Sequence, residues 1–117
     1  MSILSIVFQV ILGLGFIMFG LMKFGSKPMV EGFKHYGYPG WFRVFTGMVE
    51  VISAILVIAG IWNKTLAAWG GLFIVVTMIG AIFTHIRIKD TVQQMMMPII
   101  LFILGLVVLL LNLSSLL

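Results

Sequence analysis

The sequence predicts an all-α integral membrane protein, a four-transmembrane-helix bundle with a short interfacial helix in its first loop. The chain has 117 residues, of which 62% are hydrophobic and only 9% are charged, whereas soluble domains carry about 25% charged residues. Four apolar runs are long enough to cross a hydrocarbon core of about 30 Å, which takes roughly 20 helical residues. These runs lack the alternation of polar and apolar residues that marks a membrane barrel strand.

The four predicted membrane helices belong to a single transmembrane domain, residues 1–117. Helices are expected because lipid offers the backbone no other hydrogen-bond partners. Their approximate bounds are 3–22, 44–62, 66–86 and 95–113. The tight turn at Asn63–Thr65 makes the second and third helices antiparallel neighbours, and Arg87–Gln94 forms a polar loop. Pro98 falls in the first turns of the fourth helix, where a missing N–H is tolerated.

The first loop is the longest, and Pro28 can start a short helix within it. This helix would place apolar residues on one side and charged residues on the other, which is typical of a segment lying in the membrane interface. Tyr38 and Trp41 follow it, at the depth where aromatic belts form. Both aromatic rings also suit stacking on an aromatic ligand, so interfacial anchoring and ligand binding are alternative interpretations.

The distribution of basic residues predicts how the chain is oriented in the cell membrane. Lys64 stands alone on the side of the two termini, and six basic residues lie in or beside the first and third loops, namely Lys23, Lys27, Lys34, Arg43, Arg87 and Lys89. By the positive-inside rule, these loops are cytoplasmic and both termini lie outside. We therefore expect a multi-pass protein of the cell membrane.

Glu50 is the only acidic residue within a predicted membrane helix. An ionised carboxylate near the middle of such a helix costs roughly 2.5–3.5 kcal/mol on insertion scales, so it is expected to face the protein interior and to have a partner or a task. One interpretation is structural, with Glu50 paired to Lys23 or Arg43 to fix the helix register. The other is functional, with Glu50 exchanging protons with a ligand.

Helical spacing places the ionisable residues on the same faces as the small residues. Membrane helices meet at small residues, because these let the backbones approach, so these faces are expected to point inward. We therefore predict a cleft open on the side of the first and third loops, with Glu50 at its floor. The candidate ligand-binding residues are Lys23, Arg43, Glu50, His85, Phe16, Tyr38 and Trp41.

Several classes of function are disfavoured by the composition. Nucleic-acid binding needs a clustered basic face, and the seven Lys and Arg residues form no run. The absence of cysteine excludes disulfides and thiolate metal sites. The sequence contains neither an acidic cluster for Mg²⁺ or Ca²⁺ nor a nucleophile–base pair, so we expect no metal site and find no evident cofactor. A transporter is disfavoured because no broken helix with a paired repeat is visible.

The chain resembles the DoxX family of small four-helix membrane proteins. The resemblance covers about the first 90 residues, and its order and spacing are moderately specific. It is carried by GFIMFGLMKF (Gly15–Phe24), Phe33, GYP (Gly37–Pro39), GMVE (Gly47–Glu50), LVIAGI (Leu56–Ile61) and AIFTH (Ala81–His85).

The resemblance implies a four-helix bundle, with Lys23, Glu50 and His85 at matching polar positions. Members of this family include subunits of thiosulfate:quinone oxidoreductase and proteins linked to quinone and catechol stress in bacteria. A more distant relative assists the assembly of neuronal acetylcholine receptors. The family therefore does not fix one activity, and fold alone does not define function.

Two hypotheses follow from the sequence. The first is a membrane-embedded binder of a quinone-like or other lipophilic aromatic molecule, which supports a membrane redox or quinone-stress process. Whether it is an enzyme stays open; at most it is a quinone-linked oxidoreductase subunit without its own metal or flavin. The second is a membrane scaffold or assembly partner for another membrane protein. The expected partners are the lipid bilayer, a lipophilic aromatic ligand, and a membrane protein or further copies of the chain.

Overall fold

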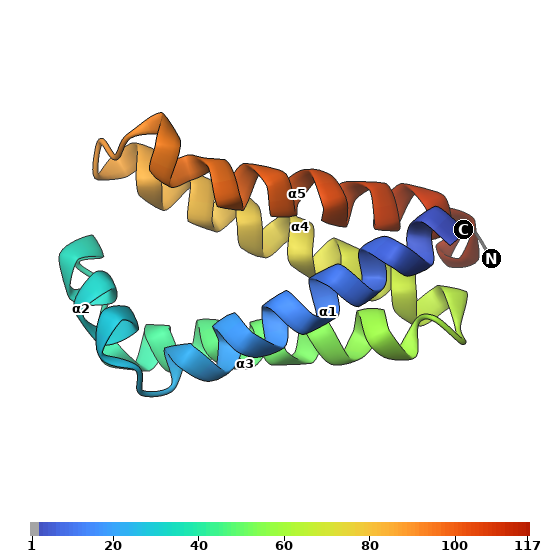
Figure 1. Ribbon diagram of the computed structural model, residues 1–117, viewed down its shortest axis with the longest axis horizontal. Coiled ribbons are helices and arrows are strands. Elements are labelled where there is room, and N and C mark those ends of the chain that lie inside the picture. Colours follow the sequence, from blue (N-terminus) through green and yellow to red (C-terminus); the bar gives the residue numbers. More distant parts are fainter. Residues whose placement is uncertain (1–2) are drawn as a thin grey trace.

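The computed structural model describes residues 3–117, in which the chain is helical almost throughout (Figure 1). The elements are α1 (Ile3–Lys23), α2 (Lys27–Tyr36), α3 (Gly40–Ala59), α4 (Lys64–Arg87), α5 (Val92–Asn112) and the short 3₁₀ helix η1 (Leu113–Leu116). Four segments are long and apolar enough to cross a membrane: α1, α3, α4, and α5 together with η1. The predicted all-α bundle with four membrane spans and a short helix in the first loop is therefore confirmed.

Three helix starts differ from the predicted bounds: α4 begins at Lys64, two residues before the predicted start, and the other two differ by three or four residues. The second membrane helix begins at Gly40 rather than Val44, with Pro39 in an extended conformation before it. The fourth begins at Val92 rather than Met95, because the Thr91 side chain accepts a hydrogen bond from the backbone N–H of Gln94 at 3.2 Å. Predicting a helix from its apolar residues alone misses a first turn that is polar. A helix includes such residues whenever their backbone groups form helical hydrogen bonds. Consequently Pro98 lies inside α5, not at its start.

Glycines hold the long helices together as two pairs. In the first pair, α1 and α3 touch at Gly20 and Gly47, where an added Cβ on Gly47 would lie 2.8 Å from the Gly20 carbonyl oxygen. In the second pair, α4 and α5 touch at Gly71, where a Cβ would lie 2.9 Å from the backbone nitrogen of Leu109. Close backbone approach of this kind is how helices associate in lipid. Figure 1 shows α1 beside α3 and α4 beside α5.

The two pairs are joined tightly at only one end of the bundle. There α3 meets α4 at Gly60 and Gly70, which would clash with Ala67 and Val57 respectively if they carried a Cβ. We call this end, where α1 begins and α5 ends, the terminus end. Toward the opposite end, formed by α2 and the α4–α5 connection and called the loop end, the pairs diverge (Figure 1). Gly80 of α4 lies on that side, and a Cβ there would meet nothing within 4 Å.

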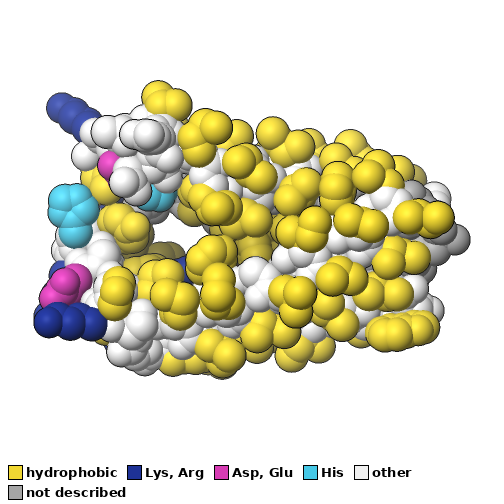
Figure 2. Space-filling model, viewed as in Figure 1, with side chains coloured by type: hydrophobic (Ala, Val, Ile, Leu, Met, Phe, Trp, Pro, Cys, Tyr) yellow, Lys and Arg dark blue, Asp and Glu magenta, His cyan; other side chains and the backbone are white. Residues whose placement is uncertain are grey.

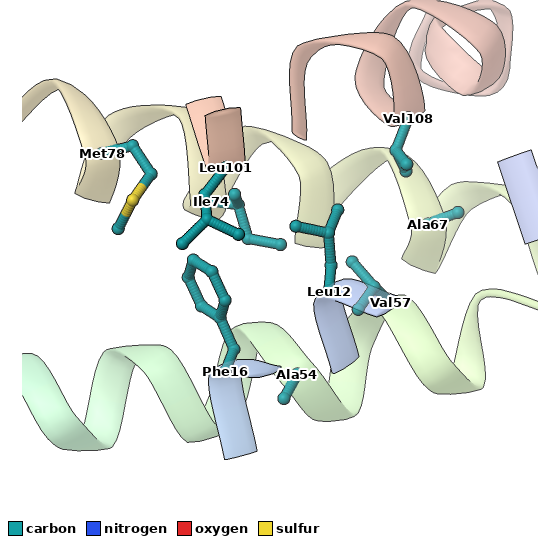
Figure 3. Close-up of a cluster of buried hydrophobic side chains, with 9 residues drawn as sticks. All are labelled: Leu12, Phe16, Ala54, Val57, Ala67, Ile74, Met78, Leu101 and Val108. Atoms are coloured by element: carbon teal, nitrogen blue, oxygen red, sulfur yellow. The ribbon is translucent and has the colours of Figure 1, made fainter. Parts of the chain in front are cut away.

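The interior of the bundle lies between the two pairs, in its middle and toward the terminus end. Figure 3 shows the buried apolar cluster, which consists of Leu12, Phe16, Ala54, Val57, Ala67, Ile74, Met78, Leu101 and Val108. Buried polar groups tie α1 to its neighbours: Gln9 Nε2 donates to the Val57 carbonyl at 2.9 Å, and Asn112 Nδ2 donates to Ser5 Oγ at 3.0 Å. These bonds satisfy polar atoms that lipid cannot serve, and they close the terminus end.

Candidate functional site

A cavity of about 770 Å³ lies between the two helix pairs at the loop end. Figure 2 shows the hollow near the end of the molecule where basic, acidic and histidine side chains gather. Pockets for small molecules usually measure roughly 300–1,000 Å³ and have mainly apolar walls, and this cavity fits both criteria. Its aromatic lining residues are Phe19, Phe33, Tyr36, Tyr38, Phe42, Phe45 and Phe83.

An ion pair between α1 and α3 forms one wall of the cavity. Lys23 Nζ lies 2.5 Å from Glu50 Oε1, and the two side chains are 13% and 3% exposed. Both residues line the cavity. The glycine contact of α1 with α3 brings the last turn of α1 against α3, which lets Lys23 reach Glu50. Arg43 supports this arrangement, because its guanidinium donates a hydrogen bond to the Lys23 backbone carbonyl.

A second polar pair lies on the opposite wall. His85 Nδ1 is 2.8 Å from Asp90 Oδ2, and His85 lines the cavity. The turn after α4 makes this pair possible: Lys89 adopts a left-handed φ of 57°, and the Asp90 N–H donates to the His85 carbonyl at 2.9 Å. With Nδ1 held by the carboxylate, Nε2 is the ring nitrogen left for another partner. The hydrogen bond from His85 holds the pKa of Asp90 below its ordinary value of 3.8.

The lowered pKa of Asp90 gives a testable pH dependence. A carboxylate whose pKa is lower in the folded than in the unfolded protein contributes stability above its unfolded pKa, and this contribution is lost as the pH falls through the folded pKa. We therefore expect Asp90→Asn to lower the thermal midpoint in detergent at neutral pH. The difference from wild type should persist at pH 3.8 and vanish only below it. An equal midpoint for both proteins at neutral pH would contradict the role assigned to this pair.

Contacts between the first loop and α4 span the loop end of the cavity. The Tyr38 hydroxyl lies 2.7 Å from Thr84 Oγ1, and the Arg87 guanidinium is 4.9 Å from the centre of the Tyr38 ring. Arg87 also donates to the Tyr36 carbonyl. Burial, followed by the charge of Asp90, raises the pKa of Tyr36 above 10.0, so its hydroxyl stays protonated at neutral pH. The sequence predicted a cleft open on the loop side, whereas these contacts bridge that side.

The cavity also borders the outer surface of the bundle on the flank formed by α3 and α4. Phe45 of α3 and Val76 and Phe83 of α4 all line it, and all three are exposed on the apolar outer surface. On a membrane-spanning chain that surface faces lipid. These exposed lining residues are apolar, so the cavity borders lipid on this flank without an intervening charged group.

The structure brings together four of the seven predicted ligand-binding residues: Lys23, Glu50, His85 and Tyr38 all line the cavity. The other three do not line it. Phe16 is fully buried in the apolar cluster, Trp41 is 70% exposed at the start of α3, and Arg43 contacts the backbone of α1. Phe16 and Lys23 share a face of α1, but Phe16 lies farther from the loop end. At that depth the two helix pairs are in contact, so Phe16 packs in the apolar cluster and does not line the cavity.

Sequence reasoning did not identify Asp90, Thr84, Tyr36 or Gly80. A signal existed for Asp90, which follows His85 by five residues in a short polar stretch. No signal could assign Tyr36 or Thr84, because their roles depend on how the first loop folds back onto α4. Within residues 3–117, no group of three or more His, Cys, Asp or Glu residues could hold a metal ion.

Comparison with known proteins identifies the family. The model of the DoxX-like family matches residues 7–108. An uncharacterized Bacillus subtilis protein, YdgD, is 35% identical over 107 residues, which cover 90% of this chain and 94% of that protein. No solved structure matched the chain. The match extends through most of α5, beyond the segment that carried the resemblance seen in the sequence, and it confirms that resemblance. The chain belongs to the DoxX-like family.

Proposed function

We propose that this protein binds a quinone-like or another lipophilic aromatic molecule in the cavity between its helix pairs, and supports a membrane redox or quinone-stress process. The observation that carries the proposal is the combination of an aromatic-lined cavity, bordered by lipid on one flank, with ionisable groups on two facing walls. Such a cavity suits a flat ring with polar atoms at opposite edges. A quinone has this form.

The residues of each wall suit one oxygen of such a ring. Lys23 carries an ammonium group that would stabilise an anionic oxygen, and Glu50 beside it can accept or donate a proton. On the facing wall, His85 would hydrogen-bond the other oxygen through Nε2 while Asp90 holds Nδ1. Aromatic side chains between the walls would pack against the ring face or edge.

The chain supplies binding and protonation groups, and a partner membrane protein would donate electrons to a bound quinone or accept them from a bound quinol. Reducing a quinone to a quinol takes two electrons and two protons, and Glu50 and His85 are the groups we assign to the protons. The protein is then a quinone-linked subunit or a ligand carrier, not a complete oxidoreductase by itself.

Partly filling the cavity should weaken binding without disturbing the fold, and Gly80 is the position at which to add a side chain. It lines the cavity, and an added side chain meets no atom within 4 Å of its Cβ. We expect Gly80→Leu to weaken binding of a soluble naphthoquinone by at least about tenfold, or about 1.4 kcal/mol, because leucine occupies ligand volume. Equilibrium titration of the purified protein in mild detergent measures this change.

Gly15→Leu is the matched control, since Gly15 also has open space around it but lies outside the cavity lining. It should bind as wild type does. Equal affinity of Gly80→Leu and wild type would contradict the proposed site. Wild-type protein that is folded and binds no quinone would favour the scaffold hypothesis, and co-purification with partner proteins would then be the next experiment.

A further inference from the structure

A second hollow, a groove of about 310 Å³, lies along the outer face of α3 and α4. It is lined by Val49, Leu72, Phe73, Val76 and Thr77. Three of these residues, Val49, Val76 and Thr77, also line the cavity. The groove is therefore a continuation of the cavity, and it leads along α4 toward the terminus end, where Leu72 and Phe73 lie.

The two hollows differ in chemistry. The cavity contains the charged groups Lys23 and Glu50, whereas the groove is lined by no charged residue. Its single hydroxyl, Thr77 Oγ1, donates a hydrogen bond to the Phe73 carbonyl at 2.7 Å. A molecule that occupied both hollows would thus place its polar part in the cavity and a hydrocarbon part in the groove.

We propose that the ligand is a long-chain amphiphile whose polar ring lies in the cavity and whose hydrocarbon chain leaves between α3 and α4 to lie in this groove. This inference rests on the proposed function and adds the hydrocarbon chain of the ligand and the path that it follows. A hydrocarbon chain is the occupant that the geometry favours, because the groove begins at the cavity wall. The loop end is bridged by Tyr38 and Thr84, whereas Val76, shared by both hollows, is exposed on the lipid-facing flank.

The binding of two probes to wild type and two variants tests the chain site, by which we mean the groove as the site of the ligand's hydrocarbon chain. The probes are a methylated naphthoquinone without a side chain and the same ring carrying an isoprenoid chain. Leu72→Trp fills the groove at a residue that does not line the cavity. Ile79→Trp is the control, because Ile79 is an apolar residue of α4 that lines neither hollow, although it is exposed whereas Leu72 is half-buried. The variant-to-wild-type affinity ratio of each probe removes the effect of partitioning into detergent.

We expect Leu72→Trp to weaken the chain-bearing probe by about three- to tenfold and to leave the chainless probe unchanged. The effect is moderate because the hydrocarbon chain of the probe leaves an apolar lipid environment for an apolar groove. Binding there gains mainly van der Waals contacts and little hydrophobic free energy. Ile79→Trp should change neither affinity. Equal ratios for the two probes would mean that ordinary bilayer lipid fills the groove, and this would overturn the chain site while leaving the ring site intact.

Photo-crosslinking of the wild-type protein keeps the test independent of how the variant folds. A diazirine at the far end of the chain should label residues 69–77 of α4 and the adjoining part of α3. Labelling spread over the outer faces of α1 and α5 would overturn the chain site. Absence of binding by either probe to folded wild type would overturn both the chain site and the proposed function.

Discussion

Replacing Lys23 by methionine is expected to destabilise the protein by about 3–5 kcal/mol, because it leaves the carboxylate of Glu50 buried without its cation. Among the described residues, Lys23 is the ion-pair partner of Glu50, whose side chain is only 3% exposed. The reverse change, Glu50→Gln, should be milder. Lys23 is the last residue of α1, so its flexible side chain can extend toward water or headgroups when the carboxylate is gone.

A double-mutant cycle separates the pair from other effects of each substitution. Lys23→Met combined with Glu50→Leu should regain most of the stability lost in Lys23→Met alone, since two apolar side chains then replace the two charges. The control is Lys64→Met, at an exposed lysine at the start of α4. Equilibrium unfolding in mixed micelles gives the free energies. A loss in Lys23→Met no larger than that in Lys64→Met would contradict the buried-pair interpretation.

Replacing Gly47 by leucine is expected to lower stability by about 3 kcal/mol, the upper part of the range usual for overpacking. The new Cβ would lie 2.8 Å from the carbonyl oxygen of Gly20 and 3.0 Å from the Cβ of Lys23, and backbone atoms cannot move aside as a flexible side chain can. The α1–α3 contact must therefore open, and this also draws Lys23 away from Glu50. Unfolding in mixed micelles measures the loss.

The comparison with Gly80→Leu makes this prediction specific. Both substitutions add the same side chain within a membrane helix, but a Cβ at Gly80 meets open space. Leucine is the better helix former of the two residues, so Gly80→Leu should not destabilise the protein. Similar losses in the two variants would show that the effect comes from the leucine itself and not from the approach of α1 to α3.

The fold was largely predictable from the sequence, because the bilayer imposes a length and a composition on each span. The helix starts were less predictable. Gly40 and Val92 begin helices whose first turns contain polar or interfacial residues, and the hydrogen bonds that define those turns do not depend on hydropathy. Which end of the bundle faces the cytoplasm stays a prediction of the positive-inside rule.

The sequence predicts a site residue best where placing that side chain in the membrane costs free energy. Glu50 is conspicuous because a carboxylate in lipid requires a partner, and the partner proved to be Lys23, one of the two candidates. Arg43 could not be separated from Lys23 by spacing, because both lie near the same membrane surface. Phe16 shares the inner face of α1 with Lys23, and only the divergence of the helix pairs decides which of them lines the cavity. Asp90 could have been suggested by its place five residues after His85, but the left-handed turn at Lys89 that brings the two side chains together is seen only in the structure.

The central claim is that the cavity holds a lipophilic aromatic molecule, and mass spectrometry of small molecules retained through mild-detergent purification tests it most directly. Wild type, Gly80→Leu and Gly15→Leu would be purified in parallel. We predict that a quinone-like molecule is enriched with wild type and with Gly15→Leu, and is lost from Gly80→Leu. A folded wild-type protein that retains no such molecule, or equal amounts of it in all three proteins, would contradict the claim.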